Sequence, residues 1–449
     1  MNNRYHFIGI GGIGMSALVR VLLQRGAQVT GSDIATSYIT DQLEKEGAQI
    51  FIGHDRNNIR EPSTVVCSTD IPSRNPEVRF AEKKGFPIVH RAELLSQIME
   101  GYSPLLVTGT HGKTTTSSLL AHVLTSIGLN PSYAIGGMVP SLGNNGHHGL
   151  GAYFVAEADE SDGSFLKYRP FGAIITNIDN DHLSYWKDEE TLIAGFKQFA
   201  GLVLSNEHFI WCGDDEKLSR LRLKGISYGF KDGNDLQVNN YQQMEWKNVF
   251  DCTYQRTSYS EIEVPLIGGH NVLNAAAVFG MGLSLGLEEK GLRSALSSFK
   301  GVNRRLEKKG EKNSIAIYDD YGHHPTEIFA TLRAVKHAIK DKRLVVIFQP
   351  HRYSRTRDCI AEFGPAFDFA DLVIITDIYA AGEAPIEGVS TELLLRKIKE
   401  SCNSEIQYVG RKEAADFLVN VLQPGDTLVT MGAGDITHLG PEVLGKLPA

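Results

Sequence analysis

The sequence predicts an α/β protein of three domains, with a Rossmann-like domain at each end and a central α/β domain built on a phosphate-binding P-loop. Short apolar segments alternate with helical segments at both ends of the chain, as in parallel sheets covered by helices. Glycine-rich loops follow strand-like segments at residues 9–14 and 109–116. Breaks in the pattern at residues 100–104 and 307–314 indicate two linkers. We therefore predict domains at residues 1–101, 102–306 and 307–449.

Charge and composition limit the classes of function. The 449-residue chain is 42% apolar and 22% charged, with a formal net charge of −8. Acidic and basic residues are interspersed, which gives no electrostatic support for a nucleic-acid partner. No apolar stretch reaches the roughly 18–20 residues that cross a bilayer, and the N-terminal segment lacks the apolar core of a signal peptide. The five cysteines lack metal or redox spacing, so we expect a cytoplasmic protein. From the charge distribution and the short apolar stretches, we expect it to bind neither nucleic acid nor membrane.

In the first domain, a glycine loop joins the first strand to the first helix. The pattern predicts a helix at residues 16–24 and strands at residues 5–10, 28–31, 65–68 and 88–89. The loop contains Gly9, Gly11, Gly12 and Gly14, and Asp33 closes the second strand. This is the pattern of a dinucleotide fingerprint, in which main-chain amides hold a diphosphate and the acid accepts from a ribose. Close packing alone, an NAD site and a phosphate site for another nucleotide all remain open.

The central domain begins with the most informative run of the chain, Gly109-Thr-His-Gly-Lys-Thr-Thr115. A strand ends at Val107 before it, and a helix reaching about residue 127 follows it. Main-chain amides of such a loop and the helix N-terminus bind phosphate, Lys113 reaches the outer phosphates, and the Thr114 hydroxyl ligates Mg²⁺. Because Val107 stands where the standard motif has its first glycine, this is a shortened P-loop.

Two acidic segments follow later strands of the central domain. Further strands are predicted at residues 153–157, 172–177, 208–211, 226–229, 236–238, 249–254 and 261–264. Residues 155–162 hold four carboxylates, one of which is suited to Mg²⁺ beside the P-loop, and a solvated acidic loop is the alternative. Residues 177–182 offer Asp179, Asp181 and His182 as further ligands.

Polar residues also mark the end of the central domain. Asn271 and Asn274 fall near the first turn of a helix predicted at residues 271–285, where amide groups can contact adenine or a phosphate. Helix capping by Asn271 is an equal alternative. Arg304 and Arg305, at the junction with the third domain, can reach a triphosphate or remain solvated.

The third domain carries two polar segments at strand ends. A helix is predicted at residues 326–333, and strands at residues 315–319, 344–348, 372–376, 406–409 and 427–431. Asp319-Asp-Tyr-Gly-His-His-Pro-Thr-Glu327 follows the first of these strands, and His351-Arg-Tyr-Ser-Arg-Thr356 follows the second. Both segments lie at carboxyl ends of parallel strands, where α/β sheets place ligands. If a helix begins at the second segment, Arg352 and Arg355 share one of its faces and can clamp a carboxylate or phosphate.

Together these motifs resemble those of the Mur ligase family over nearly the whole chain. The run 109–114 is highly specific for this family, and segments 157–162, 319–325 and 349–355 favour its alanine-adding member. The resemblance implies an ATP-dependent ligase of cytoplasmic peptidoglycan synthesis, with ATP and Mg²⁺ as cofactors. It implies UDP-N-acetylmuramate and L-alanine as substrates, joined through an acyl phosphate on the lactyl carboxylate, and a monomer or homodimer.

The resemblance also assigns roles to residues. It implies a UDP-sugar site at Gly9, Gly11, Gly12, Gly14, Met15, Ser16 and Asp33. It implies ATP binding by Gly109, Thr110, His111, Gly112, Lys113, Thr114, Thr115, Asn271, Asn274 and Arg304. The implied metal ligands are Thr114 and Glu157, with His182 near a second ion. The implied amino-acid site comprises Tyr321, His323, His351, Arg352 and Arg355, and the implied catalytic residues are Lys113, His182, His323 and Arg352.

Two other functions remain open from the sequence. A recycling ligase that attaches a tripeptide to the same UDP-sugar would share these motifs. An NAD-dependent oxidoreductase would account for the first glycine loop and Asp33, but it leaves the P-loop and residues 155–162 without a role. Two features depart from the family: residues 141–148 are unusual near the presumed sugar-binding loop, and no lysine can be assigned as a carbamylated support for a metal.

Overall fold

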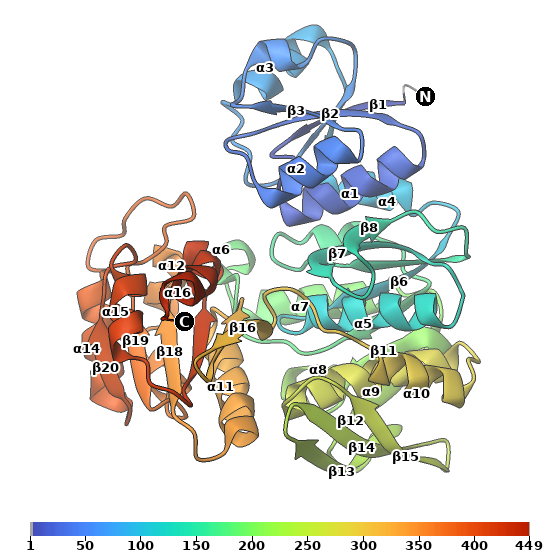
Figure 1. Ribbon diagram of the computed structural model, residues 1–449. Helices are drawn as coiled ribbons and strands as arrows, with labels where there is room; N and C mark the ends of the chain where they lie inside the picture. Colours follow the sequence, from blue (N-terminus) through green and yellow to red (C-terminus); the bar gives the residue numbers. More distant parts are fainter. Residues whose placement is uncertain (1–2, 449) are drawn as a thin grey trace. The chain divides into compact units, whose positions relative to one another are not determined.

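The computed structural model describes residues 3–448 and confirms the α/β class (Figure 1). Its strands form three sheets of five, ten and six strands. The chain divides into two compact units. The first comprises Met1–Asn240, Phe250–Val264 and Leu273–Lys300, and the second comprises Tyr241–Val249, Pro265–Val272 and Gly301–Ala449. The domain boundaries predicted after residues 101 and 306 stay predictions.

The first sheet is parallel throughout and carries the glycine loop. Its strands lie in the order β3 (Gln49–Ile52), β2 (Gln28–Asp33), β1 (Arg4–Ile8), β4 (Thr64–Cys67) and β5 (Ile88–His90). Its helical elements are α1 (Ile13–Gln24), α2 (Tyr38–Lys45), η1 (Arg56–Asn58), α3 (Pro76–Lys84) and α4 (Arg91–Ile98). The strand order reverses beside β1, so the loop after β1 lies at the switch point where such sheets bind ligands.

The second sheet contains the P-loop strand near its middle. Its order is β15 (Thr257–Val264), β14 (Lys247–Tyr254), β13 (Leu236–Met244), β12 (Ile226–Gly229), β11 (Phe209–Cys212), β10 (Gly172–Ile175), β6 (Ser103–Thr108), β9 (Tyr153–Glu157), β7 (Ser132–Val139) and β8 (Asn144–His147). The pairs from β12 to β7 are parallel, while β7 and β8 form an antiparallel hairpin. The sequence analysis missed this hairpin, and the unusual residues 141–148 fall largely within it.

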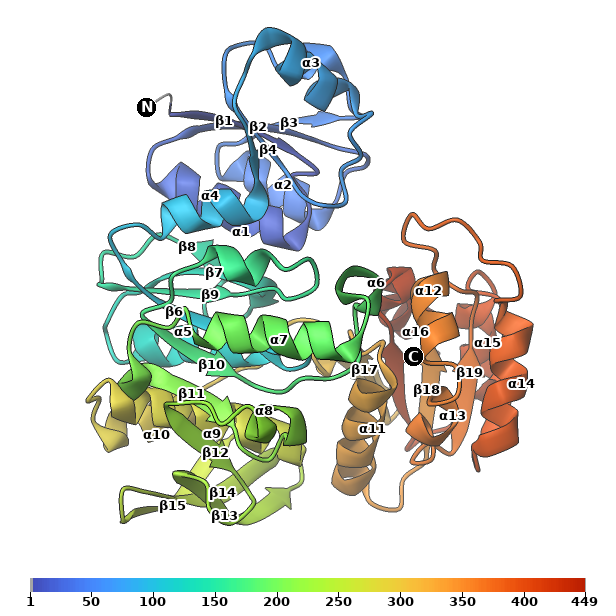
Figure 2. The same ribbon diagram turned by 180° about the vertical axis from the view of Figure 1, so that it is seen from behind.

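Helices cover both faces of the parallel part of this sheet. The helical elements are α5 (Lys113–Ser126), η2 (Ser164–Lys167), α6 (Leu183–Trp186), α7 (Glu189–Ala200), η3 (Asn206–His208), α8 (Glu216–Arg220), α9 (Gly269–Ser284) and α10 (Glu289–Ser297). Helix α5, which follows the P-loop, lies on one face, and α7 lies on the other (Figures 1 and 2). The P-loop is thus the connection between a buried strand and a buried helix.

The third sheet is parallel except at one edge. Its order is β16 (Glu307–Lys312), β17 (Ile315–Asp320), β21 (Thr427–Met431), β18 (Leu344–Phe348), β19 (Leu372–Ile375) and β20 (Glu405–Tyr408). Its helical elements are α11 (Pro325–Ile339), α12 (Tyr353–Asp358), α13 (Phe363–Ala366), α14 (Thr391–Ser401), α15 (Ala414–Val421), η4 (Asp435–His438) and α16 (Leu439–Lys446). The inner strands β18, β19 and β21 are buried along their whole length, as parallel strands covered on both faces must be.

Both predicted linkers were partly wrong. Residues 307–312 form the antiparallel edge strand β16, paired with β17, and not a linker. The strand could not be predicted from the charged sequence Glu-Lys-Lys-Gly-Glu-Lys, because apolar alternation is absent where an edge strand faces solvent. Charged side chains on an edge strand also hinder pairing with the strands of other chains. In the other linker, residues 103–104 already belong to β6.

Two further observations bear on the cellular setting. Among residues 3–448, the structure contains no helix with both the length and the hydropathy needed to cross a membrane. All five cysteines are free thiols.

A buried histidine links the P-loop helix to its neighbour. The His122 imidazole on α5 lies 3.0 Å from the carbonyl oxygen of Ala295 on α10 and 3.0 Å from the Ser298 hydroxyl. Burial lowers the pKa of His122, and the hydrogen bond to the Ala295 carbonyl only partly offsets it. The imidazole is therefore neutral in the folded protein at neutral pH.

This neutral histidine predicts acid sensitivity. The unfolded chain takes up a proton near pH 6.5, while folded His122 does so only at a lower pH. Within that window the unfolded state binds more protons, so the free energy of unfolding falls as pH falls, by at most about 1.4 kcal/mol per pH unit. A His122→Gln variant should show a smaller loss of melting temperature between pH 7.5 and 5.5 than the parent. The exposed His337, changed to Gln, is the control; an equal loss in all three proteins would contradict the assignment.

Candidate functional site

The glycine loop of the first sheet is hydrogen-bonded to the end of strand β2. The amides of Gly9 and Ile10 both donate to the carbonyl oxygen of Ser32, at 2.8 and 3.0 Å. The Gly11 amide donates to Asp33 Oδ2 at 2.8 Å, and a Cβ on Gly11 would lie 2.9 Å from that oxygen. Asp33 closes β2 as predicted, and its carboxylate orders the loop, a role that the sequence analysis did not foresee.

The side chains of Met15 and Ser16 lie inside the protein. Met15 is 3% exposed and Ser16 is fully buried, with its hydroxyl donating to the Ile13 carbonyl at 2.9 Å. A UDP-sugar contact by these two residues, which stays a prediction, would have to come from their main-chain amides at the start of α1. The N-cap Gly12 offers no side-chain cap, so the Met15 amide is available to an anion, whereas the Ser16 amide already donates to the Gly12 carbonyl at 2.8 Å.

Sequence analysis also missed a buried polar contact between α1 and the β7–β8 hairpin. The Asn145 amide donates to the Ile13 carbonyl at 2.8 Å and to the Ser16 hydroxyl at 3.2 Å. Its oxygen accepts from the guanidinium of Arg20, which is 1% exposed and also pairs with Glu46 at 3.0 Å. The helix that carries the glycine loop is therefore fixed to the sheet that carries the P-loop.

The P-loop backbone depends on two glycines and on the end of the neighbouring strand. Gly109 and Gly112 have φ values of +133° and +82°, in the region that favours glycine. A Cβ on Gly109 would lie 2.0 Å from Thr176 Oγ1, and one on Gly112 would lie 2.9 Å from Asn274 Oδ1. Asn274 therefore lies directly against the P-loop, as its predicted role requires.

Asn177 clamps the loop from the strand β10 side. Its carbonyl oxygen accepts from the Thr110 amide at 3.0 Å, and its side-chain oxygen accepts from the His111 amide at 2.9 Å. Its side-chain amide donates back to the His111 carbonyl at 3.0 Å. Neither Asn177 nor Thr176 was among the predicted site residues, although both precede the acidic segment that the sequence analysis singled out.

The predicted metal ligands Thr114 and Glu157 are neighbours. The Thr114 hydroxyl donates to Glu157 Oε2 at 3.3 Å. Glu157 Oε1 accepts from the Ser117 hydroxyl at 3.2 Å and from the Gly136 amide at 2.7 Å. The carboxylate is thus oriented by α5 and β7 toward the first turn of the P-loop helix. A hydroxyl and a carboxylate oxygen are ligands that Mg²⁺ prefers.

The P-loop lysine is paired with a carboxylate from the acidic segment. Lys113 Nζ donates to Glu160 Oε2 at 2.7 Å, and Glu160 is 1% exposed. Burial alone would lower the pKa of Lys113, but the Glu160 and Asp159 carboxylates outweigh it and raise that pKa. Burial raises the pKa of Glu160 to about 7, with Asp159 adding to the effect and Lys113 opposing it. Glu160 lies in the predicted acidic segment, but the sequence analysis gave it no role of its own.

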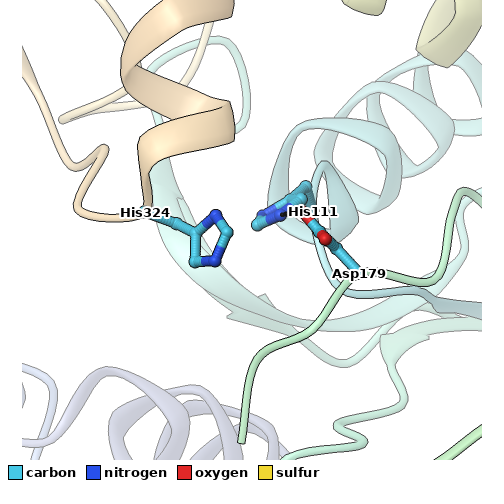
Figure 3. Close-up of side chains that lie close together, drawn as sticks. All are labelled: His111, Asp179 and His324. Carbon is cyan, nitrogen blue, oxygen red and sulfur yellow. Dashed lines mark hydrogen bonds and ion pairs between the residues drawn. The ribbon is translucent and has the colours of Figure 1, made fainter. Parts of the chain in front are cut away.

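The second acidic segment contacts the P-loop through Asp179. The His111 imidazole lies 2.9 Å from Asp179 Oδ2, and both side chains are drawn in Figure 3. The Asp179 amide donates to the Thr110 hydroxyl at 2.9 Å. His182, at the start of α6, has a left-handed φ of +58° and lies 3.5 Å from Asp181 Oδ2. Its place beside a second metal ion stays a prediction.

In the second unit, the Arg304 side chain contacts residues of that same unit. Its guanidinium donates to the carbonyls of Gly432 and Gly434 at 2.9 and 3.1 Å and lies 4.8 Å from the centre of the Tyr321 ring. The Asn271 side chain donates to the Ile267 carbonyl at 2.8 Å. Contacts of Arg304 and Asn271 with ATP stay predictions, and they would require new partners for both side chains.

The predicted amino-acid residues form an aromatic and cationic cluster. The ring centres of Tyr321 and His323 lie 5.4 Å apart, those of His323 and His351 lie 5.8 Å apart, and His351 stacks on Tyr379. Burial lowers the pKa of His351 to about 3, with His323 and the nearby arginines adding to the effect. His351 is therefore neutral at physiological pH and serves as a ring surface or hydrogen-bonding group. The Arg355 guanidinium contacts it at 3.4 Å.

The helical arrangement predicted for the two arginines was wrong. Helix α12 begins at Tyr353, and Arg352 is its N-cap with a φ of +71°. Arg352 and Arg355 therefore do not share a face by helical spacing. The Arg352 amide donates to the Tyr379 carbonyl at 2.9 Å, and its side chain lies 3.9 Å from Glu383. Such a backbone conformation is rare for a non-glycine residue and is often retained at functional sites.

The family models that match the chain cover almost all of it. They are described as the catalytic domain of the Mur ligase family at residues 4–103, the Mur ligase middle domain at residues 107–282, and the glutamate ligase domain of Mur ligases at residues 304–434.

Named relatives match over almost the full length of this chain. The UDP-N-acetylmuramate–L-alanine ligase of Protochlamydia amoebophila is 48% identical over 448 residues, which covers 100% of this chain and 99% of the relative. The enzyme of the same name from Desulfosudis oleivorans is 43% identical, covering 98% of each chain. The bifunctional enzyme MurC/Ddl of Chlamydia trachomatis is 43% identical over 98% of this chain and 54% of its own length.

A solved structure agrees with these matches. The UDP-N-acetylmuramate-alanine ligase MurC of Thermotoga maritima superposes with a TM-score of 0.86 at 29% identity, covering 99% of this chain and 98% of that one. This likeness supports the three-domain α/β arrangement. With family models along most of its length and a relative 48% identical end to end, the chain belongs to the Mur ligase family.

Proposed function

We propose that this protein is a UDP-N-acetylmuramate–L-alanine ligase, which joins L-alanine to the lactyl carboxylate of UDP-N-acetylmuramate using ATP. The observation that carries the proposal is the end-to-end match, at 42–48% identity, to relatives of that name. The P-loop with Lys113, Thr114 and Glu157 supports it, because a triphosphate site of this kind has no use in the NAD-dependent alternative. The relatives also favour it over the tripeptide-adding alternative.

The chemistry explains why ATP is needed. A carboxylate does not react with an amine, because oxide is an impossible leaving group. Transfer of the γ-phosphoryl group to the lactyl carboxylate releases ADP and gives an acyl phosphate. The alanine amine then attacks the acyl carbon, and inorganic phosphate leaves as the amide forms and the amine loses a proton.

In the central domain, different residues would bind ATP and assist phosphoryl transfer. The loop amides that Asn177 does not occupy, together with those at the start of α5, would cradle the phosphates, and Lys113 would stabilise the charge that develops on the transferred phosphoryl group. Thr114 and Glu157 would hold Mg²⁺, whose charge offsets that of the β- and γ-phosphates. Asn274 and Arg304 would contact the nucleotide, and His182 would assist a second ion.

The other two sites supply the reactants. The glycine loop would hold the UDP diphosphate through the uncapped amides at the start of α1, with Asp33 near the nucleoside. The cluster of Tyr321, His323 and His351 would receive L-alanine, and Arg352 and Arg355 would bind its carboxylate. His182 or His323 would take the amine proton. Each of these contacts, like the domain boundaries, a cytoplasmic location and a monomeric or dimeric state, is part of the proposal.

One assay separates the candidate functions. Purified protein with ATP, Mg²⁺ and UDP-N-acetylmuramate should release phosphate when L-alanine is added, and mass spectrometry should detect the alanyl product. Glycine, L-serine and the tripeptide L-Ala-γ-D-Glu-meso-diaminopimelate serve as competing substrates. Activity with the tripeptide but not with L-alanine would favour the recycling alternative. No phosphate release with any substrate would reject the ligase assignment.

The P-loop assignment predicts the effect of Lys113→Ala. Loss of this ammonium removes charge stabilisation from the transferred phosphoryl group, so phosphate release should fall on the order of a thousandfold. Lys397→Ala, which removes an exposed lysine paired only with Glu400 on its own helix, should retain full activity. Turnover near the parent rate in Lys113→Ala would rule out the P-loop role.

The carboxylate clamp predicts a selective effect of Arg352→Ala. A charge-assisted hydrogen bond is worth about 1.5–3 kcal/mol, so the KM for L-alanine should rise roughly ten- to hundredfold while the KM for ATP stays within about twofold. Arg357, which lies on the short helix that follows Arg352 and pairs with the adjacent Asp358, gives the matched control when changed to Ala. An unchanged KM for L-alanine would remove Arg352 from the clamp.

A further inference from the structure

The Lys113 ammonium has a full set of partners before any nucleotide binds. It donates to the carbonyl oxygens of Gly109 at 2.7 Å and Thr110 at 3.2 Å and to Glu160 Oε2 at 2.7 Å. An ammonium group has three donors, and these three acceptors use all of them. The side chain is therefore folded back onto its own loop, and it must give up at least one partner to reach a phosphate.

Glu160 differs from the acids on either side of it. Asp159 accepts from the Ser161 amide at 3.0 Å, and Asp162 accepts from the Ser164 amide at 3.0 Å, so both carboxylates order their own loop. Glu160 Oε1 is buried and has no hydrogen-bond partner among residues 3–448, and Oε2 bonds to Lys113. Burying a carboxylate with one oxygen unsatisfied costs free energy. The contact with Lys113 accounts for the position of Glu160, whereas hydrogen bonds within its own loop do not.

The main chain at Glu160 is anchored. The Trp186 indole donates to the Glu160 main-chain carbonyl at 2.9 Å, and its ring packs edge-on against Phe165 at 6.0 Å between ring centres. Trp186 and Phe165 are both buried. The base of the Glu160 side chain is therefore held in place beside the P-loop, and the long Lys113 side chain is the part that has to move when a nucleotide binds.

We propose that Glu160 is a positioning residue that competes with the nucleotide phosphates for the Lys113 ammonium and so limits how tightly ADP is retained after the reaction. The inference rests on the proposed ATP site. The Glu160 carboxylate, 2.7 Å from the ammonium, opposes its transfer to phosphate and draws it back when the γ-phosphoryl group has left. Glu160 thereby favours release of the product nucleotide.

The test is ADP affinity in a charge-removing variant. Glu160→Gln keeps the shape of the side chain but removes the competitor, so calorimetric titration with ADP and Mg²⁺ should give roughly tenfold tighter binding. The ADP inhibition constant should fall by the same factor, and kcat should fall because ADP release slows. Asp162→Asn removes a charge from the same loop without touching Lys113, and it should leave ADP affinity as in the parent.

Other results would overturn either the inference on Glu160 or the proposed function, and the two cases can be told apart. Equal or weaker ADP binding in Glu160→Gln overturns the inference, since a merely structural carboxylate would weaken the site when altered. Glu160→Asp retains the charge but withdraws it by one methylene, and it should bind ADP with an affinity between the parent and Glu160→Gln. If Glu160→Gln lacks a cooperative thermal transition, the Asp variant decides, and parental ADP affinity in that variant overturns the inference. Failure of the parent to bind ADP at all would instead reject the proposed function.

Discussion

The site depends on the backbone shape of the P-loop. Gly109 and Gly112 adopt conformations that other residues reach only with strain, and the surroundings leave no room for a Cβ at either position. Asn177 then pins the loop through three hydrogen bonds to the Thr110 and His111 main chain. Because the loop is fixed from a neighbouring strand, its backbone needs little reorganisation when a phosphate binds to the amides that Asn177 leaves available.

The fold was predictable wherever burial imposes a period on the sequence. Inner strand β18 is wholly buried and is a continuous apolar run, and α5 followed directly from the P-loop motif. Three of the strands that were missed, β3, β8 and β16, lie at sheet edges. Strand β16 is charged and β3 is half exposed, so neither carries the apolar pattern that identifies a strand. Pairing with a neighbouring strand, which sequence spacing does not reveal, decides their structure.

The candidate site was predictable to a different extent. The family resemblance named Thr114, Glu157 and Asn274, and the structure places Thr114 beside Glu157 and Asn274 against the P-loop, while their roles stay predictions. Spacing did not reveal the residues that orient them, such as Asn177, which act through tertiary hydrogen bonds between distant segments. It also failed at Arg352, whose left-handed backbone is set by the contact with Tyr379 and not by helix propensity.

The buried contact of Arg20 with Asn145 restricts which substitutions the two positions tolerate. Each side chain satisfies the other inside the protein, and Asn145 also holds the first turn of α1. Replacing Arg20 alone leaves the buried Asn145 oxygen without its donor, and replacing Asn145 alone takes an acceptor from the Arg20 guanidinium, which keeps its pair with Glu46; an unsatisfied buried polar group costs about 1–3 kcal/mol. The two positions are therefore expected to change together among homologues, in step with each other although 125 residues separate them.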